Sequence, residues 1–152
     1  MLEDYARLAR PYFVMLGIVT AGRWLQGTAF GTAYEQGTHV FSIVTLTLFA
    51  SLFSAVFLRR WRGWRLGDAA AFAIFMAVVS QLVIWLSTVV SYALNVPSYF
   101  SHPMALNRQA EPVAFLPAMG FRAVGLVVNS LLNGIAGALG WALGSLLPQK
   151  AP

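Results

Sequence analysis

Four charged or ionisable side chains offer the clearest chemistry in the sequence, namely Arg23, Glu35, His39 and Arg122. All four are predicted near the external ends of membrane-spanning segments. The simpler interpretation is an ion pair between Glu35 and one of the arginines, which would neutralise charge at the membrane boundary. The alternative is a pocket in which two arginines bind a lipid phosphate or a carboxylate and His39 accepts a proton.

A second group of polar side chains falls in the middle of the predicted spans. Gln81, Asn129 and Asn133 are amides in otherwise apolar segments. Amides in membrane helices most often bond to a neighbouring helix, so we expect a structural role. The functional alternative is that the three converge on a hydrated cavity or a ligand.

Catalytic and metal chemistry find little support in the sequence. Without cysteine there is no thiolate nucleophile or thiolate metal ligand. The two histidines, His39 and His102, are too few for a zinc site, and Asp68 is predicted on the opposite side of the membrane from His39. We therefore predict no catalytic residue and no metal. No cofactor is required, although His39 leaves single ligation of a tetrapyrrole open.

The composition places these residues in a membrane protein, since 59% of the chain is hydrophobic and only 10% is charged. About 20 apolar residues cross the hydrocarbon core as a helix. Four segments are long enough, at residues 11–30, 40–58, 69–94 and 121–147. The sequence thus predicts an all-α integral membrane protein in which residues 1–152 form one bundle of four transmembrane helices.

The basic residues predict the orientation of this bundle, because Lys and Arg gather in cytoplasmic loops. Seven of the ten fall on one side, and they are Arg7, Arg10, Arg59, Arg60, Arg62, Arg65 and Lys150. Trp61 and Trp64 interleave with the central arginines and suit the headgroup layer. We expect both termini to be cytoplasmic, and the preference for arginine over lysine suggests a bacterial inner membrane.

The external connection between the third and fourth spans, residues 95–120, is unusually long. Its four prolines exclude one continuous helix. Tyr99, Phe100, Phe115 and Leu116 indicate a loop that lies on the membrane surface or caps the bundle, and binding of a partner is the alternative.

A small and polar stripe on the fourth span is the strongest internal pattern. At 100° per residue one face collects small residues and amides, while leucines occupy the other. Small residues let membrane helices approach closely. We predict a helix-packing interface made of Asn129, Asn133, Ala136, Gly137, Gly140 and Gly144, with Ser80, Ser87 and Ser91 on the third span.

Three functions agree with this inventory. The first is a non-catalytic subunit that packs into a larger membrane complex, since the small-residue faces exceed the needs of a minimal bundle. The second is a small carrier or channel that acts as a homo-oligomer and uses the mid-membrane amides. The third is a lipid- or cofactor-binding protein that uses the external Arg/Glu/His cluster. Partners are expected among membrane lipids, other membrane subunits or further copies of the chain, and not among nucleic acids.

Overall fold

The computed structural model describes residues 2–148, and about three quarters of these residues are helical. The elements are α1 (Leu2–Leu8), α2 (Arg10–Thr28), α3 (Tyr34–Gly37), α4 (Ile43–Arg62), α5 (Leu66–Ala93), α6 (Pro103–Leu106) and α7 (Phe115–Ser145). The all-α prediction is confirmed for these residues, among which there is no strand. Lys150, which entered the topology argument, lies outside the described residues.

Three of the helices, α4, α5 and α7, are long and apolar enough to cross a membrane. The protein is accordingly an integral membrane protein. The predicted first span also forms a helix, α2, of 19 residues. However, α2 does not reach the apolarity of the other three among the described residues, because Arg10, Arg23 and Gln26 interrupt it.

Helix α4 extends beyond the predicted second span into the basic segment. Helix α4 continues through Arg59, Arg60 and Arg62 and ends only at Gly63, which adopts the left-handed conformation with φ of 63°. Glycine takes this conformation without a Cβ penalty and commonly ends helices. The connection to α5 is therefore only residues 63–65, and most of the arginine cluster is the last turn of a helix.

Helix α7 likewise begins before the predicted start of the fourth span. Helix α7 begins at Phe115, six residues before the expected position, and contains Pro117. Proline lacks only an N–H that the first turn of a helix leaves unbonded, so it does not interrupt the helix there. The long connection is thereby shortened to residues 94–114, with α6 inside it.

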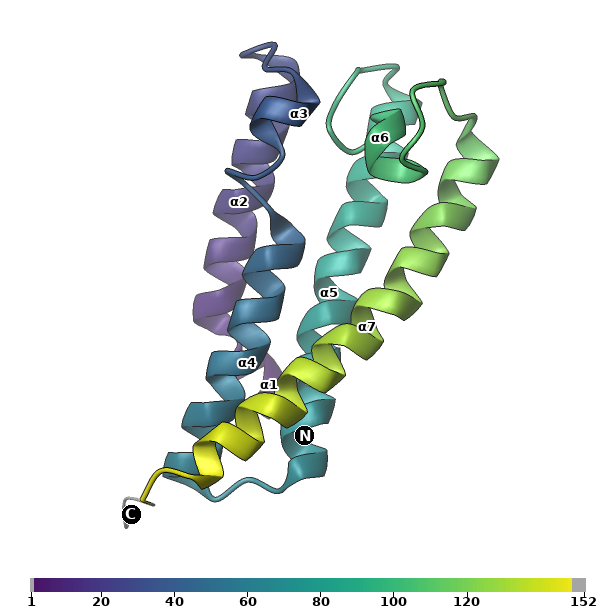
Figure 1. Ribbon diagram of the computed structural model, residues 1–152. Coiled ribbons are helices and arrows are strands. Elements are labelled where there is room, and N and C mark those ends of the chain that lie inside the picture. The colour runs from purple at the N-terminus through teal and green to yellow at the C-terminus, as the bar shows by residue number, and fades with distance from the viewer. Residues whose placement is uncertain (1, 149–152) are drawn as a thin grey trace.

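The four long helices, which are α2, α4, α5 and α7, form one bundle (Figure 1). Helices α2 and α4 lie on one side, and α7 crosses α4 near one end and diverges from it toward the other. The α4–α5 connection, α1 and the C-terminal end of α7 share the lower end of the bundle, whereas α3, α6 and the long connection share the upper end. The bundle therefore has two chemically different ends.

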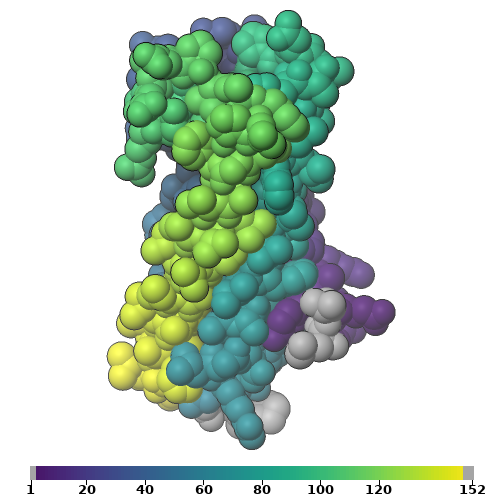
Figure 2. All heavy atoms as spheres, turned by 90° about the vertical axis from the view of Figure 1, so that its right-hand side faces the viewer, coloured from purple at the N-terminus to yellow at the C-terminus, as the bar shows by residue number. Residues whose placement is uncertain are grey.

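The core runs along α5 and the inner face of α2. Phe72 and Met76 on α5 contact Tyr5 and Tyr12, and all four are buried. On the outside, large apolar side chains stay exposed along every long helix, such as Phe53 on α4 and Leu131 on α7. Figure 2 shows α7 as a diagonal ridge across one face, beside α5. Apolar outer faces of this extent suit contact with lipid.

Candidate functional site

The upper end of the bundle is closed by the connection between α5 and α7. Phe100 from this connection is only 1% exposed and packs against Trp24 of α2, with the ring centroids 5.4 Å apart. Beside it, the Tyr99 hydroxyl donates to the carbonyls of Thr32 and Ala33 at 2.7 and 3.0 Å. Of the two arrangements expected for this segment, the structure shows the one in which it caps the bundle.

Beneath this cap lies a cavity of about 190 Å³ that both membrane-end arginines line. Arg23 reaches it from α2 and Arg122 from α7. Phe100 and Ala105 contribute from the connection, and Ile84 contributes from α5. Two side chains that are 99 positions apart in the sequence are thus brought to one space.

Arg122 is held by the cap as well as by its own neighbours. Its Nε donates to the Thr88 hydroxyl at 2.9 Å, and one terminal nitrogen donates to the Phe100 carbonyl at 2.6 Å. The other terminal nitrogen is 3.5 Å from the Ala105 carbonyl, which is a weak contact. These neutral acceptors fix the position of the guanidinium group and leave its charge without a counter-ion.

Arg23 has a similar environment of neutral groups. It donates to the Phe41 carbonyl at 3.2 Å, and its guanidinium carbon lies 5.6–5.9 Å from the ring centroids of Tyr34, Tyr99 and Phe100. Rings at this distance attract a cation weakly and do not neutralise it. Among the described residues neither arginine forms an ion pair, since the one salt bridge in them joins Arg7 to Asp4.

The beginning of α4 adds further positive potential to the same cavity. Ser42, the N-cap residue, and Ile43 and Val44 of the first turn are part of the lining. The Ser42 hydroxyl accepts from the Thr45 N–H, but the N–H groups of Ile43 and Val44 have no acceptor among the described residues. Free N–H groups at a helix N-terminus favour an anion.

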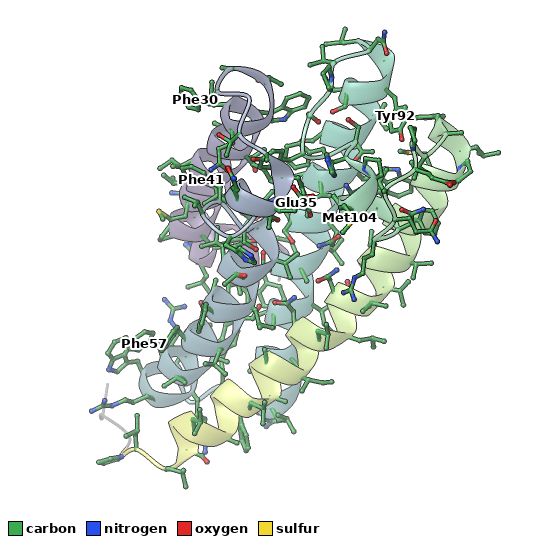
Figure 3. The ribbon with its side chains drawn as sticks, turned by 45° about the horizontal axis from the view of Figure 1, so that its top comes forward. Phe30, Glu35, Phe41, Phe57, Tyr92 and Met104 are labelled. Atoms are coloured by element: carbon green, nitrogen blue, oxygen red, sulfur yellow. The ribbon has the colours of Figure 1, made fainter. Side chains whose placement is uncertain are left out.

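Glu35 and His39 do not join the two arginines. Both are exposed, and neither lines the cavity. Figure 3 shows Glu35 on the α3 side of the upper end. The expected ion pair between Glu35 and Arg23 or Arg122 is not formed in the structure, because α3 ends at Gly37 and places the carboxylate at the surface. His39 follows α3 in an exposed turn.

The three mid-membrane amides differ in their surroundings. Asn133 is buried, accepts a hydrogen bond from the Ser51 hydroxyl at 2.8 Å and donates to the Asn129 carbonyl. Asn129 donates to the Gly125 carbonyl. The Gln81 side chain is 5% exposed and has no hydrogen-bond partner among the described residues. Gln81 is therefore the one amide of the three whose side chain has no hydrogen-bond partner among the described residues.

The small-residue stripe of α7 faces other helices of the same chain. A Cβ placed on Gly140 would overlap the Leu52 carbonyl oxygen of α4, and one on Gly144 would lie 2.8 Å from the Val56 carbonyl oxygen. Toward α5, a Cβ on Gly137 would be 2.7 Å from that of Ala73. Ala136 lies buried on this face.

The three serines of the predicted interface bond to α5 itself, to α2 and to the connection that follows α5. Ser80 donates to the Ala77 carbonyl, and Ser87 accepts from the Trp24 indole at 3.4 Å. The hydroxyls of Ser91 and Ser98 are 2.6 Å apart, which joins α5 to the cap.

The basic lower end is organised by tryptophan. The Trp141 indole donates to the Trp64 carbonyl at 2.7 Å, and the Arg59 guanidinium lies 5.0 Å from the Trp141 ring. Arg60 is half-buried, whereas Trp61, Arg62 and Arg65 are exposed. One of these arginines, Arg62, lines a shallow pocket together with Asp4 and Asp68.

Neither metal-binding side chains nor similarity to known proteins points to a second site. The described residues contain no group of three or more His, Asp or Glu side chains that could hold a metal ion. No protein family, curated protein or solved structure matches the chain. The evidence for the arginine cavity as a site is therefore its geometry.

Sequence reasoning named both arginines but missed the rest of the cavity. Thr88 and Phe100 hold Arg122, and Ser42 begins the helix whose first turn lines the cavity. A serine before an apolar run is a recognisable N-cap signal, so Ser42 could have been found. The role of Phe100 depends on how the connection folds back, for which the sequence carries no local signal.

Proposed function

We propose that this membrane protein binds a molecule with a phosphate or carboxylate group in the cavity between Arg23 and Arg122. The observation that carries the proposal is that both arginines line one small cavity and form no ion pair among the described residues. This is the third of the functions considered from the sequence, without the participation of Glu35 and His39.

The physical argument is the cost of unpaired charge. Removing a guanidinium from water is expensive, and the cost is recovered only when an opposite charge and further hydrogen bonds accompany it. Here two such groups and the N-terminus of α4 share one space without a carboxylate. A bound anion would neutralise them, and the planar fork of arginine suits the oxygens of phosphate or carboxylate.

The membrane topology that goes with this proposal has four spans. In it α2 crosses the membrane beside α4 and α5, with its polar side chains turned to the bundle, as the burial of Gln26 supports. The arginine-rich lower end and both termini would be cytoplasmic under the positive-inside rule, and the cavity would open near the external leaflet. The preference for arginine supports a bacterial inner membrane.

The test is a titration of the purified protein in a neutral detergent with short-chain phosphatidic acid and, separately, with inorganic phosphate. Tryptophan fluorescence reports binding, since Trp24 contacts Phe100 at the edge of the cavity. We expect Arg23→Gln to weaken binding at least tenfold, the effect of losing a charge-assisted hydrogen bond. Arg7→Gln, which changes an exposed arginine paired with Asp4, is the matched control.

The two variants separate a site from general attraction. Equal weakening by Arg23→Gln and Arg7→Gln would indicate that the protein attracts anions only through its net charge, and the proposal would be rejected. Saturable binding that Arg7→Gln leaves unchanged and Arg23→Gln removes would support it.

A second candidate, packing against another membrane helix, is favoured by one observation. An apolar groove of about 480 Å³ runs between α2 and α5, and Gly17 and Ala21 in its wall form a small-xxx-small pair on an outward face. The partner would be another membrane subunit or a second copy, as in an accessory role. The mass of the particle extracted in a mild detergent tests this, and a monomer without copurifying subunits would reject it.

A further inference from the structure

Positions on two helices, α5 and α7, place Gln81 directly below the arginine cavity. On α5 it precedes Ile84 of the cavity wall by three residues, which is about 4.5 Å along a helix. On α7 the residue opposite is Gly125, three residues beyond Arg122, and a Cβ placed there would be 3.7 Å from Gln81 Oε1. Both helices therefore put the amide one short step deeper than the guanidinium groups.

The hydrogen-bonding groups around Gln81 are already engaged with other partners. The Gly125 carbonyl accepts from Asn129 at 2.8 Å, and the Ala77 carbonyl on its own helix accepts from Ser80 at 2.8 Å. Gln81 is 5% exposed as a residue, and its amide makes no hydrogen bond with the described residues. A buried amide without partners is costly, and such groups mark sites for a ligand or a water.

The bundle is closed farther below the amide. About two turns deeper on α7, Asn133 bonds to Ser51 of α4, and Gly140 then packs directly on α4. Above this point α4 and α7 diverge toward the cavity (Figure 1). A molecule that enters from the cavity thus meets the Gln81 amide before it reaches the closed part of the bundle.

We infer that the ligand is a glycerophospholipid, whose phosphate binds the two arginines and whose ester carbonyl accepts a hydrogen bond from the Gln81 amide. This inference rests on the proposed function and adds the class of ligand. The glycerol carbons separate a phosphate from an ester carbonyl by a few bonds, which matches an amide one short step below the arginines. Isoprenoid phosphates and free fatty acids provide the anion but have no carbonyl at that place.

The experiment compares two lipids that differ only in whether their chains carry ester carbonyls. Diester phosphatidic acid and its diether analogue with the same chains are titrated into the protein in neutral detergent, with inorganic phosphate as a third probe. We expect the unaltered protein to prefer the diester lipid about fivefold, the worth of one hydrogen bond. Gln81→Leu should remove this preference by weakening only the diester lipid.

Gln26→Leu is the matched control, because it also removes a buried amide with an unpartnered oxygen but lies on α2, three residues beyond Arg23 toward the upper end and not below the arginines. It should keep the preference for the diester lipid. Equal affinity of the unaltered protein for the two lipids would overturn the inference, and this comparison needs no variant to fold.

The other outcomes separate this inference from the proposed function. If Arg23→Gln abolishes binding of both lipids while the diester preference is absent, the anion site stands and the role of Gln81 is wrong. If inorganic phosphate binds as tightly as either lipid, the site serves a free anion and the inference is overturned. If none of the three probes binds, both proposals fail.

Discussion

The close contact between α4 and α7 makes Gly140→Ala the sharpest test of the fold. A single methyl group at this position would overlap the Leu52 carbonyl oxygen and lie 3.0 Å from the Ala55 Cβ. Neither atom is the end of a flexible side chain, so the two helices must separate. Gly144, one turn further on, meets backbone of α4 in the same way, so a shift at Gly140 also affects that contact.

The magnitude follows from two opposing effects. Overpacking a tight interface costs about 1–3 kcal/mol. Alanine in place of glycine inside a helix returns about 0.5–1 kcal/mol. Gly120→Ala in the same helix isolates the second effect, because nothing lies within 4 Å of a Cβ there. The propensity gains cancel in the comparison, so we expect Gly140→Ala to be less stable than Gly120→Ala by about 2 kcal/mol.

Reversible unfolding by sodium dodecyl sulfate in mixed micelles, followed by tryptophan fluorescence, measures this difference. Trp141 is a useful reporter, since its indole donates to the Trp64 carbonyl near the same contact. Equal stability of the two alanine variants would refute the close approach of α4 and α7. Helicity measured by circular dichroism should stay unchanged in both, because the substitution acts on the packing between helices.

Three further perturbations test the remaining contacts. Asn133→Leu should destabilise the bundle by about 0.5–1.5 kcal/mol, because it removes the hydrogen bond from Ser51. Leu139→Ala on the exposed face of α7 should cost less in the same unfolding assay. A larger loss for Leu139→Ala would contradict the assignment of Asn133 to the packed face. Tyr99→Phe removes the hydroxyl that holds the cap to Thr32 and Ala33, so hydrogen exchange in residues 94–114 should accelerate, and unchanged exchange would argue against this anchor. Thr88→Val removes the acceptor of Arg122 Nε without changing the side-chain shape, so we expect weaker binding of phosphatidic acid in the fluorescence titration. The paired change Thr20→Val should have little effect, because Thr20 lies outside the cavity lining and its hydroxyl bonds to the Leu16 carbonyl of its own helix.

The helices were predictable because their signals are local. Apolar length alone locates α4, α5 and α7, although their ends shift by several residues. The shifts have simple causes, since Arg59 to Arg62 continue a helix until Gly63 and Pro117 is tolerated in a first turn. Charge and proline content suggested loops at both places because neither property reports where backbone hydrogen bonds end.

The candidate site was predictable only in part, because its members meet through tertiary folding. Arg23 and Arg122 stand out as charges in apolar segments, and their shared depth follows from the antiparallel order of the spans. Which carboxylate stays away from them depends on the length of α3 and the course of the connection after it. Glu35 is only 12 residues from Arg23 in the sequence, yet it lies at the surface. Phe100 is 77 residues from Arg23, and its ring centroid lies 5.7 Å from the Arg23 guanidinium carbon.

The same reasoning changes the meaning of the glycine stripe on α7. A stripe of small residues indicates that another helix approaches closely, but it does not say to which chain that helix belongs. Here Gly137 meets α5 and Gly140 and Gly144 meet α4, so the stripe is occupied within the protein. Its tight lower contact, together with the wider upper end where the cavity lies, gives the bundle a closed lower half and an upper half with room for a ligand. The glycines of α7 thereby favour the proposed site, because they set the crossing from which α4 and α7 diverge toward the two arginines.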